Sequence, residues 1–218
     1  MTRVKICGIA GTADARRAAE LGAWALGMVF WQGSPRACPI EEAERVGAEL
    51  HRRVLLTGVF VNAPLDELAR VAERCRLGML QLHGDEGPAY CREAARRTGC
   101  KVMKAARVRD AAQVRALKAF PATDYHLLDA YSRRAPGGSG ESFDWELARL
   151  HPGSPPLGLA GGLTPENVGE AIERALPFAV DTASGTDSEP GRKDHAKVEA
   201  FFGAVAAADA RLAPAPAA

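Results

Sequence analysis

Long apolar runs and an export signal are both missing from this chain of 218 residues. Residues 1–6 carry charges where a signal peptide needs an apolar core. The longest nearly apolar stretch, residues 21–31, is too short to cross a bilayer. We therefore expect a cytoplasmic protein that is not bound to a membrane.

Cysteine pairs and an excess of charge of one sign are missing as well. The five cysteines are odd in number and form no Cys-x-x-Cys pair, which argues against a disulfide framework and a structural zinc site. The 28 Lys and Arg residues nearly cancel the 27 Asp and Glu residues, leaving a net charge of +1. Such a chain has no strong field for nucleic acid, so any anionic ligand must be held by a local site.

The composition is that of an ordinary globular domain. Hydrophobic residues make up 47% of the chain and charged residues 25%. The length suits one domain with a sizeable core, and no linker divides it. We expect a catalytic domain over residues 1–205 and a disordered Ala- and Pro-rich tail over residues 206–218.

Short apolar runs alternate about eight times with Ala-, Glu- and Arg-rich stretches of helical period. Such non-alternating runs are typical of a parallel sheet covered by helices. Asp14, Pro64 and the pair Thr164-Pro165 are helix start signals. The predicted strands are 4–7, 25–30, 55–61, 79–83, 101–105, 126–129, 156–160 and 179–181, and the predicted helices are 14–21, 40–50, 65–75, 88–98, 111–119, 144–150, 165–175 and 196–207.

The order of these elements predicts an α/β protein with a single-domain (β/α)8 barrel of the TIM type. An open doubly wound sheet could use similar units, but residues 8–11 do not form the Gly-x-Gly-x-x-Gly fingerprint expected after its first strand. In a barrel the active groups lie at the C-terminal ends of the strands. The residues that close each strand are therefore the candidate site.

Two strand ends carry candidate acid–base groups. Cys7 closes the first strand and is either a small buried hydrophobe or a thiolate base; Lys5 lies one layer below on the same face and could favour the thiolate. Asp129 closes the apolar sixth strand and is either a loop cap or a general acid kept protonated by burial. His126 lies on the opposite, helix-facing side, and we interpret it as structural.

Glycines follow the last two strands. Gly161-Gly162 follows the seventh and Ser184-Gly185 the eighth. Glycine lets backbone N–H groups approach an anion, and each loop leads towards the start of a helix. Because a barrel's phosphate site commonly lies in these two loops, we predict a bound phosphate rather than tight turns alone. Residues 137–140, rich in glycine, are interpreted as a mobile loop that could cover a ligand.

Three further side chains are candidate ligand contacts. Arg36, after the second strand, is either a carboxylate clamp or a solvated surface residue. Gln81 and His83 share a face at the end of the fourth strand, so both could face the barrel mouth. A structural role for His83 is the alternative.

Taken in order, these segments resemble the phosphoribosylanthranilate isomerase family from Val4 to about Phe202. Each segment is modest alone, but the ordered set is highly specific. The matching segments are Val4-Lys5-Ile6-Cys7-Gly8, Ser34-Pro35-Arg36, Gly58-Val59-Phe60-Val61-Asn62, Leu80-Gln81-Leu82-His83-Gly84-Asp85-Glu86, Leu128-Asp129, Gly137-Gly138-Ser139-Gly140, Phe143-Asp144-Trp145, Ala160-Gly161-Gly162-Leu163, Asp181 with Ser184-Gly185, and Pro190-Gly191-Arg192-Lys193-Asp194.

The resemblance implies a cofactor-independent aldose–ketose isomerase of tryptophan biosynthesis that binds a phosphosugar and no metal. Its reaction would be the Amadori rearrangement of N-(5-phosphoribosyl)anthranilate to 1-(2-carboxyphenylamino)-1-deoxyribulose 5-phosphate. The resemblance implies that Asp129 protonates the ribose ring oxygen and that Cys7 then removes the proton on C2′. Arg36 would hold the anthranilate carboxylate, Asp181 would help to orient the amine, and the two glycine loops would bind the phosphate.

Departures and alternatives remain at this point. The loop at 181–185 reads Asp-Thr-Ala-Ser-Gly where the family more often has Asp-Val-Ser-Ser-Gly, so Ala183 lacks one possible hydroxyl. The nearest alternative is the sibling isomerase of histidine biosynthesis, or a dual-substrate enzyme, but that family has an aspartate where this chain has Cys7. A metal-dependent epimerase and a catalytically inactive barrel are more distant alternatives. The sequence leaves open whether the chain is a monomer or a homodimer.

Overall fold

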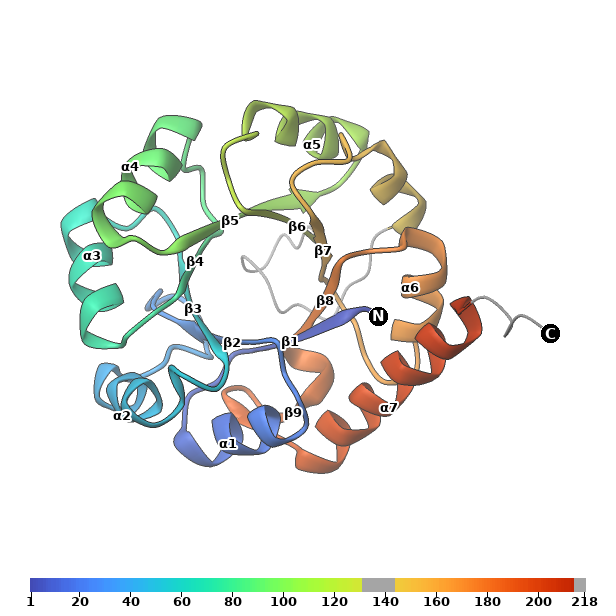
Figure 1. Cartoon of the computed structure of the whole chain (residues 1–218), viewed down its shortest axis with the longest axis horizontal. Coiled ribbons are helices and arrows are strands. Elements are labelled where there is room, and N and C mark those ends of the chain that lie inside the picture. Colours follow the sequence, from blue (N-terminus) through green and yellow to red (C-terminus); the bar gives the residue numbers. More distant parts are fainter. Residues whose placement is uncertain (131–143, 214–218) are drawn as a thin grey trace.

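Eight parallel strands close into a barrel in the computed structural model, which describes residues 1–130 and 144–213 (Figure 1). Strands adjacent in sequence are neighbours in the barrel, and β8 pairs with β1 to close it. The predicted (β/α)8 barrel is thereby confirmed. The strands are β1 Arg3–Cys7, β2 Ala25–Val29, β3 Leu55–Phe60, β4 Met79–Leu82, β5 Lys101–Val108, β6 Tyr125–Ala130, β7 Leu157–Leu159 and β8 Ala179–Thr182.

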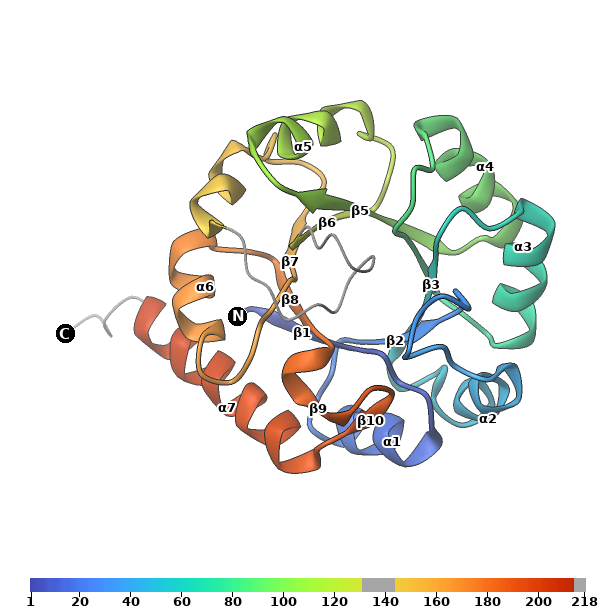
Figure 2. The same cartoon turned by 180° about the vertical axis from the view of Figure 1, so that it is seen from behind.

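Helices surround the barrel on the outside (Figures 1 and 2). They bury apolar stripes of helical period against the strands; α2, for example, buries Ala43, Val46 and Leu50. The helices are α1 Thr12–Glu20, α2 Ile40–Leu50, α3 Leu65–Arg74, α4 Pro88–Thr98, α5 Ala111–Ala116, α6 Val168–Ala175 and α7 His195–Leu212, with 3₁₀-helices η1 Leu117–Ala119, η2 Trp145–Leu150 and η3 Ser184–Thr186.

The barrel interior is apolar at one level and polar at another. Met79, Met103 and Leu127 form part of a buried cluster between the strands. Lys5 and Asp181, one on each of the two strands that close the barrel, are also buried. Because a buried ammonium or carboxylate needs a partner, this second level is where chemistry is expected.

Several element boundaries differ from those predicted; α1, for example, begins at Thr12 rather than at Asp14, and β5 continues to Val108. α6 begins at Val168 rather than at 165, because Thr164 starts a turn: Glu166 N donates to Thr164 Oγ1 at 3.3 Å, and Asn167 is the N-cap. Residues 145–150 form a 3₁₀-helix, not an α-helix. α7 continues to Leu212, so the tail predicted to be disordered from residue 206 is helical over 206–212, where Ala208 is buried.

An antiparallel hairpin after β8 was not predicted. β9 Asp187–Glu189 pairs with β10 Arg192–Lys193, and Figure 2 shows both beside α1. Its strands are too short to carry a hydrophobic period, but the dipeptide Pro190-Gly191 between them is a turn signal, and Gly191 has φ +84°. No helix within the described ranges is long and apolar enough to span a membrane. The glycine-rich segment 137–140 lies outside the described residues.

Candidate active site

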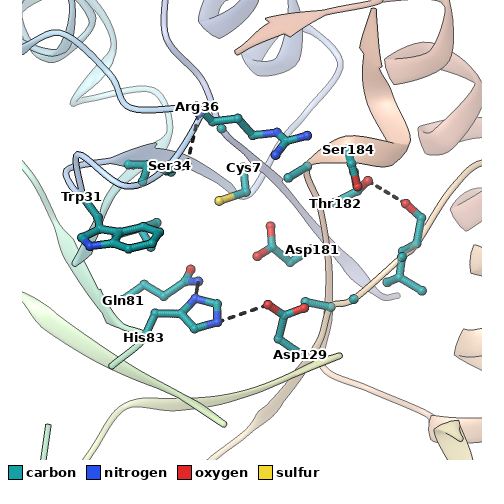
Figure 3. Close-up of a pocket in the computed structure, with 18 of the residues that line it drawn as sticks. Cys7, Trp31, Ser34, Arg36, Gln81, His83, Asp129, Asp181, Thr182 and Ser184 are labelled. Carbon is teal, nitrogen blue, oxygen red and sulfur yellow. Dashed lines mark hydrogen bonds and ion pairs between the residues drawn. The ribbon is translucent and has the colours of Figure 1, made fainter. Parts of the chain in front are cut away.

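A cavity that opens to solvent lies at the C-terminal ends of the barrel strands (Figure 3). The structure brings all but one of the predicted site residues to its wall. Gly185 is the exception; a Cβ there would lie 2.0 Å from Leu163 O, so its role is to let two loops approach each other. The predicted residues that line the cavity are Cys7, Arg36, Gln81, His83, Asp129, Gly161, Gly162, Asp181 and Ser184.

Cys7 ends β1 directly above Lys5, as the alternation of the strand requires. The neighbouring strand makes room for both side chains at Gly27, where an added Cβ would lie 2.7 Å from Cys7 Sγ and 3.0 Å from Lys5 Nζ. Burial is the largest influence on the Cys7 thiol and raises its pKa; the Lys5 ammonium opposes that rise. Lys5 is thus the cation best placed to stabilise a thiolate at Cys7.

Asp181 on β8 is the partner of Lys5. The carboxylate Oδ2 lies 2.8 Å from Lys5 Nζ, and both side chains are buried. Burial opposes the charge on Lys5, but attraction by Asp181 and Cys7 outweighs it, so the pKa of the ammonium is raised. Burial also raises the pKa of the Asp181 carboxyl, and Lys5 offsets this only in part.

The second oxygen of Asp181, Oδ1, is buried and has no hydrogen-bond partner among the described residues. Figure 3 shows this carboxylate between Cys7 and Asp129. A buried acceptor without a donor is costly unless something else supplies one. A ligand N–H or O–H that enters the cavity can do so.

Asp129 stands beside His83, which in turn contacts Gln81. Gln81 Nε2 lies 3.2 Å from His83 Nδ1, and His83 Nε2 lies 3.1 Å from Asp129 Oδ2. The second approach is close but is not aligned as a hydrogen bond. With the amide of Gln81 donating to Nδ1, the ring proton is on Nε2 and faces the carboxyl group. Gln81 and His83 therefore lie in a row beside Asp129 at the cavity wall.

The loops after β7 and β8 are joined at the rim. Gly161 and Gly162 have φ +85° and +65°, and a Cβ on Gly161 would lie 2.3 Å from Ala130 N. Thr182 Oγ1 donates to Leu163 O at 2.8 Å, which ties β8 to the β7 loop. The two predicted anion-binding loops thus form one continuous side of the cavity.

Arg36 crosses the rim above Cys7 (Figure 3). Its side chain passes Gly8, where a Cβ would lie 2.7 Å from Arg36 Cδ and where φ is +76°. Ser34 Oγ accepts from Arg36 N at 3.1 Å, and Asp187 Oδ2 accepts from Arg36 Nε at 2.6 Å. The guanidinium is therefore fixed at the mouth of the cavity rather than solvated.

Several residues that line or support the cavity wall were not singled out as candidates from the sequence. Trp31 and Val59 form an apolar wall suited to an aromatic ring, although neither stands out in the sequence. Asp187 and Lys193 support Arg36 from the hairpin. Within residues 1–130 and 144–213, no group of three or more His, Cys, Asp or Glu side chains is arranged to hold a metal ion.

The arrangement combines a thiol above an ammonium, a carboxyl group on another strand, an anion-binding rim and a fixed arginine. Such a site can move protons on a phosphorylated ligand that carries a second anionic group. Proton transfer at two places on one small molecule requires an acid and a base held in a common cavity.

Comparison with known proteins identifies the family. The model of the N-(5′-phosphoribosyl)anthranilate isomerase family matches residues 4–204. The chain is 50% identical over 198 residues to the N-(5′-phosphoribosyl)anthranilate isomerase of Citrifermentans bemidjiense, covering 91% of this chain and 94% of that protein.

Solved structures agree. The phosphoribosylanthranilate isomerase of Thermotoga maritima has 37% identity and a TM-score of 0.86, with 95% of this chain and 100% of that chain covered. An isomerase in complex with reduced 1-(o-carboxyphenylamino)-1-deoxyribulose 5-phosphate has 36% identity and a TM-score of 0.83, with the same coverage of both chains. The chain belongs to the N-(5′-phosphoribosyl)anthranilate isomerase family.

Proposed function

We propose that Cys7 and Asp129 are the general base and the general acid with which this protein isomerises N-(5′-phosphoribosyl)anthranilate in tryptophan biosynthesis. One observation carries the assignment of roles. A buried thiol on β1 and a buried carboxyl group on β6 line the same cavity, whose rim is formed by the β7 and β8 loops. This geometry supports attack on two positions of one phosphorylated ribose.

In the first step Asp129 donates its proton to the ring oxygen of the ribose. The lone pair on the anthranilate nitrogen forms a double bond to C1′ as the bond from C1′ to the ring oxygen breaks. The product is an open-chain Schiff base, with the leaving oxygen now a hydroxyl. His83, beside Asp129, keeps the carboxyl group aimed at that oxygen.

In the second step the Cys7 thiolate removes the proton from C2′. The electron pair of that bond forms the C1′–C2′ double bond, and the nitrogen takes back the pair of its double bond to C1′, which gives an enolamine. Loss of the proton on the C2′ hydroxyl and protonation of C1′ then give the ketone, so the reaction is an isomerisation with no net oxidation. Lys5 stabilises the thiolate form that this step needs.

Binding groups surround these two residues. Backbone N–H groups of the β7 and β8 loops hold the phosphate, with Ser184 at the rim. Arg36 holds the anthranilate carboxylate, and Oδ1 of Asp181 accepts a hydrogen bond from the anthranilate amine. Trp31 and Val59 contact the aromatic ring.

The decisive experiment follows the loss of substrate fluorescence for the wild type, Cys7→Ser and Asp129→Asn. Each substitution should lower kcat by about 10²- to 10⁴-fold, the range for losing a general acid or base. Both variants should still bind the reduced product analogue, since neither residue contributes mainly to affinity. A variant that keeps its kcat removes the role of the residue it replaces.

Matched controls separate chemistry from packing. Cys100 is a buried cysteine away from the cavity whose Sγ donates to Leu77 O at 3.1 Å, a bond that a serine can make. Asp66 is an exposed carboxylate on α3. Cys100→Ser and Asp66→Asn should turn over at close to the wild-type rate.

A further inference from the structure

Arg36 is held by a buried ion network with Asp187 and Lys193, neither of which donates or accepts a proton in the proposed mechanism. Asp187 Oδ2 lies 2.6 Å from Arg36 Nε, and Asp187 Oδ1 lies 2.5 Å from Lys193 Nζ. The three side chains are 11%, 6% and 1% exposed in the order Arg36, Asp187, Lys193. Lys193 Nζ also donates to Ala183 O at 2.9 Å, which connects the network to the β8 loop.

The hairpin of β9 and β10 is built around this network. Asp187 and Lys193 are paired across the two strands. At the turn, a Cβ on Gly191 would come within 3.8 Å of Arg36 Cα, so the hairpin packs directly on the backbone of the arginine. Asp14 on α1 accepts from Lys193 N at 2.9 Å and anchors the hairpin to the barrel.

The three side chains of the network carry a net charge of +1, which favours binding of an anionic ligand. Arg36 and Asp187 alone would form a neutral pair, and the Lys193 ammonium brings the sum to +1. Burial lowers the pKa of the Lys193 ammonium, and the Asp187 carboxylate, 2.5 Å away, opposes that change.

The guanidinium is engaged through only one of its nitrogens. Nε is bonded to Asp187, and among the described residues the structure shows no partner for the two terminal nitrogens. A guanidinium fixed at Nε presents those two nitrogens as a planar fork, which matches the two oxygens of a carboxylate. Asp187 is thus a positioning residue for a receptor of planar anions.

We propose that Asp187, balanced by Lys193, positions Arg36 to bind the ring carboxylate of anthranilate, so that the hairpin determines selectivity for substrates carrying that carboxylate. The inference rests on the proposed function, which supplies the substrate. A phosphate is the other anion in the same molecule, and Figure 3 shows Arg36 extending towards the side of the cavity where Ser184 lies. The test therefore distinguishes the two anions.

Three ligands are compared by titration calorimetry: the reduced product 1-(2-carboxyphenylamino)-1-deoxyribulose 5-phosphate, its phenylamino counterpart without the carboxylate, and its dephosphorylated form. The proteins are the wild type, Arg36→Met, Asp187→Asn and Glu189→Gln. Glu189 is the matched control, because it is an exposed carboxylate on the same strand and pairs with the exposed Arg192.

Asp187→Asn should raise the Kd for the full ligand about tenfold, as expected when a group that orients a binding residue is lost. The Kd for the ligand without the carboxylate should stay within about twofold of the wild-type value. The Kd for the dephosphorylated ligand should rise by the same factor as the Kd for the full ligand. Arg36→Met should show the same pattern more strongly, and Glu189→Gln should resemble the wild type. In turnover, KM should rise while kcat changes little.

The outcomes that overturn the proposal are distinct from one another. Asp187→Asn raises the sum of charges from +1 to +2, so a purely electrostatic role predicts tighter binding of the full ligand. Equal weakening with and without the carboxylate would mean that Asp187 only maintains structure, and an effect confined to phosphorylated ligands would assign Arg36 to the phosphate. If Arg36→Met does not weaken the full ligand, the role of Arg36 in the proposed function is wrong.

Discussion

The thiol of Cys7 is subject to opposing influences that its strand position alone does not reveal. Burial favours the neutral thiol, the ammonium of Lys5 favours the thiolate, and Asp181 again favours the thiol. Only the thiolate can remove a proton from carbon. In the proposed mechanism, the rate at neutral pH therefore depends on a lysine that need not touch the substrate.

Replacing Lys5 by Met should move the alkaline rise of kcat/KM to higher pH by about one unit or more, because a cation within a few ångströms of a thiol shifts its pKa by about 1–3 units. The sign follows from the charge: without the ammonium the thiolate is less stable, so more alkaline conditions are needed to form it. The measurement is the pH dependence of kcat/KM for both proteins.

Two further substitutions separate the effect of charge from that of packing. Asp181→Asn removes a negative charge from beside the thiol and should move the same rise to lower pH. Gly27→Ala keeps every charge but places a methyl group 2.7 Å from Cys7 Sγ and 3.0 Å from Lys5 Nζ, so both side chains must shift and kcat should fall. If kcat/KM of Lys5→Met rises at the same pH as that of the wild type, Lys5 does not stabilise the thiolate.

Sequence pattern predicted which single residues line the cavity, but not which residues they pair with. Cys7 and Asp129 were found because each is a reactive group closing an apolar strand at the end where barrel enzymes place their sites. The partners are remote: 176 residues separate Lys5 from Asp181, and 151 separate Arg36 from Asp187. No spacing rule connects such positions, because the barrel's closure and the hairpin's packing bring them together.

At the scale of elements, helices with a clear apolar period and a marked boundary residue were predicted accurately, whereas the hairpin after β8 was missed. α2 and α4 begin and end where predicted, because their apolar periods are long and are bounded by Pro39 and Gly99. The hairpin of β9 and β10 has strands of three and two residues, which carry no period to detect. Short elements held by side-chain ion pairs are invisible to pattern analysis for this reason.

A pair of histidines joins β6 to the turn after η2. His126 Nε2 lies 3.1 Å from Phe120 O, and its Nδ1 lies 2.8 Å from His151 Nε2. Gly153 N donates to His151 Nδ1 at 3.2 Å. These contacts are all hydrogen bonds when both rings are neutral, because a proton added to either ring turns an acceptor into a donor that faces another donor. His126 is thus structural, as its outward direction on the strand indicated.

Acid should therefore weaken the fold through this pair. Burial lowers the pKa of His151 to about 4, and burial also lowers that of His126. Since an unfolded histidine titrates near 6.5, the stabilisation is complete above about pH 6.5 and is lost as the pH falls towards about 4. The loss should amount to about 1–2 kcal/mol, less than the full shift of His151 because that ring is partly exposed.

The test compares urea-unfolding free energies at neutral and acid pH for the wild type, His151→Gln and His195→Gln. The difference between the two pH values should be smaller in His151→Gln than in the wild type. His195 is an exposed histidine at the start of α7 that pairs with Asp14 at 2.8 Å, so its replacement should not make the difference between the two pH values smaller. An unaltered pH dependence in His151→Gln would contradict the account.

At the scale of the whole molecule, the last helix fastens the first strand. Thr2 donates to Asp209 through both its N–H and its hydroxyl, each at 2.7 Å. Exposed ion pairs also join α1 to α2, α2 to α3, α3 to α4, α6 to α7 and α7 to α1. Such pairs contribute little one by one, so the buried contacts of α7 matter more.

Truncation after residue 205 should lower the free energy of unfolding by about 2–4 kcal/mol, because it removes the buried Ala208 and two hydrogen bonds to a carboxylate. Chemical denaturation of the shortened and complete chains measures this loss. Arg211→Gln, which removes only an exposed ion pair, should change it little. Equal stability of the two chains would mean that residues 206–212 contribute nothing, as the predicted tail implied.

The register between β1 and β8, the two strands that close the barrel, has a consequence for how the enzyme loses activity in denaturant. Lys5 and Asp181 are opposite each other on the first and last strands, so their pairing exists only while those strands meet. A partly loosened molecule whose helices survive would already have lost the electrostatic support of its sulfur. We expect rising urea to abolish turnover before it diminishes the helical circular dichroism signal. Loss of turnover would then detect the opening of the barrel at a lower urea concentration than the circular dichroism signal, which averages over all helices.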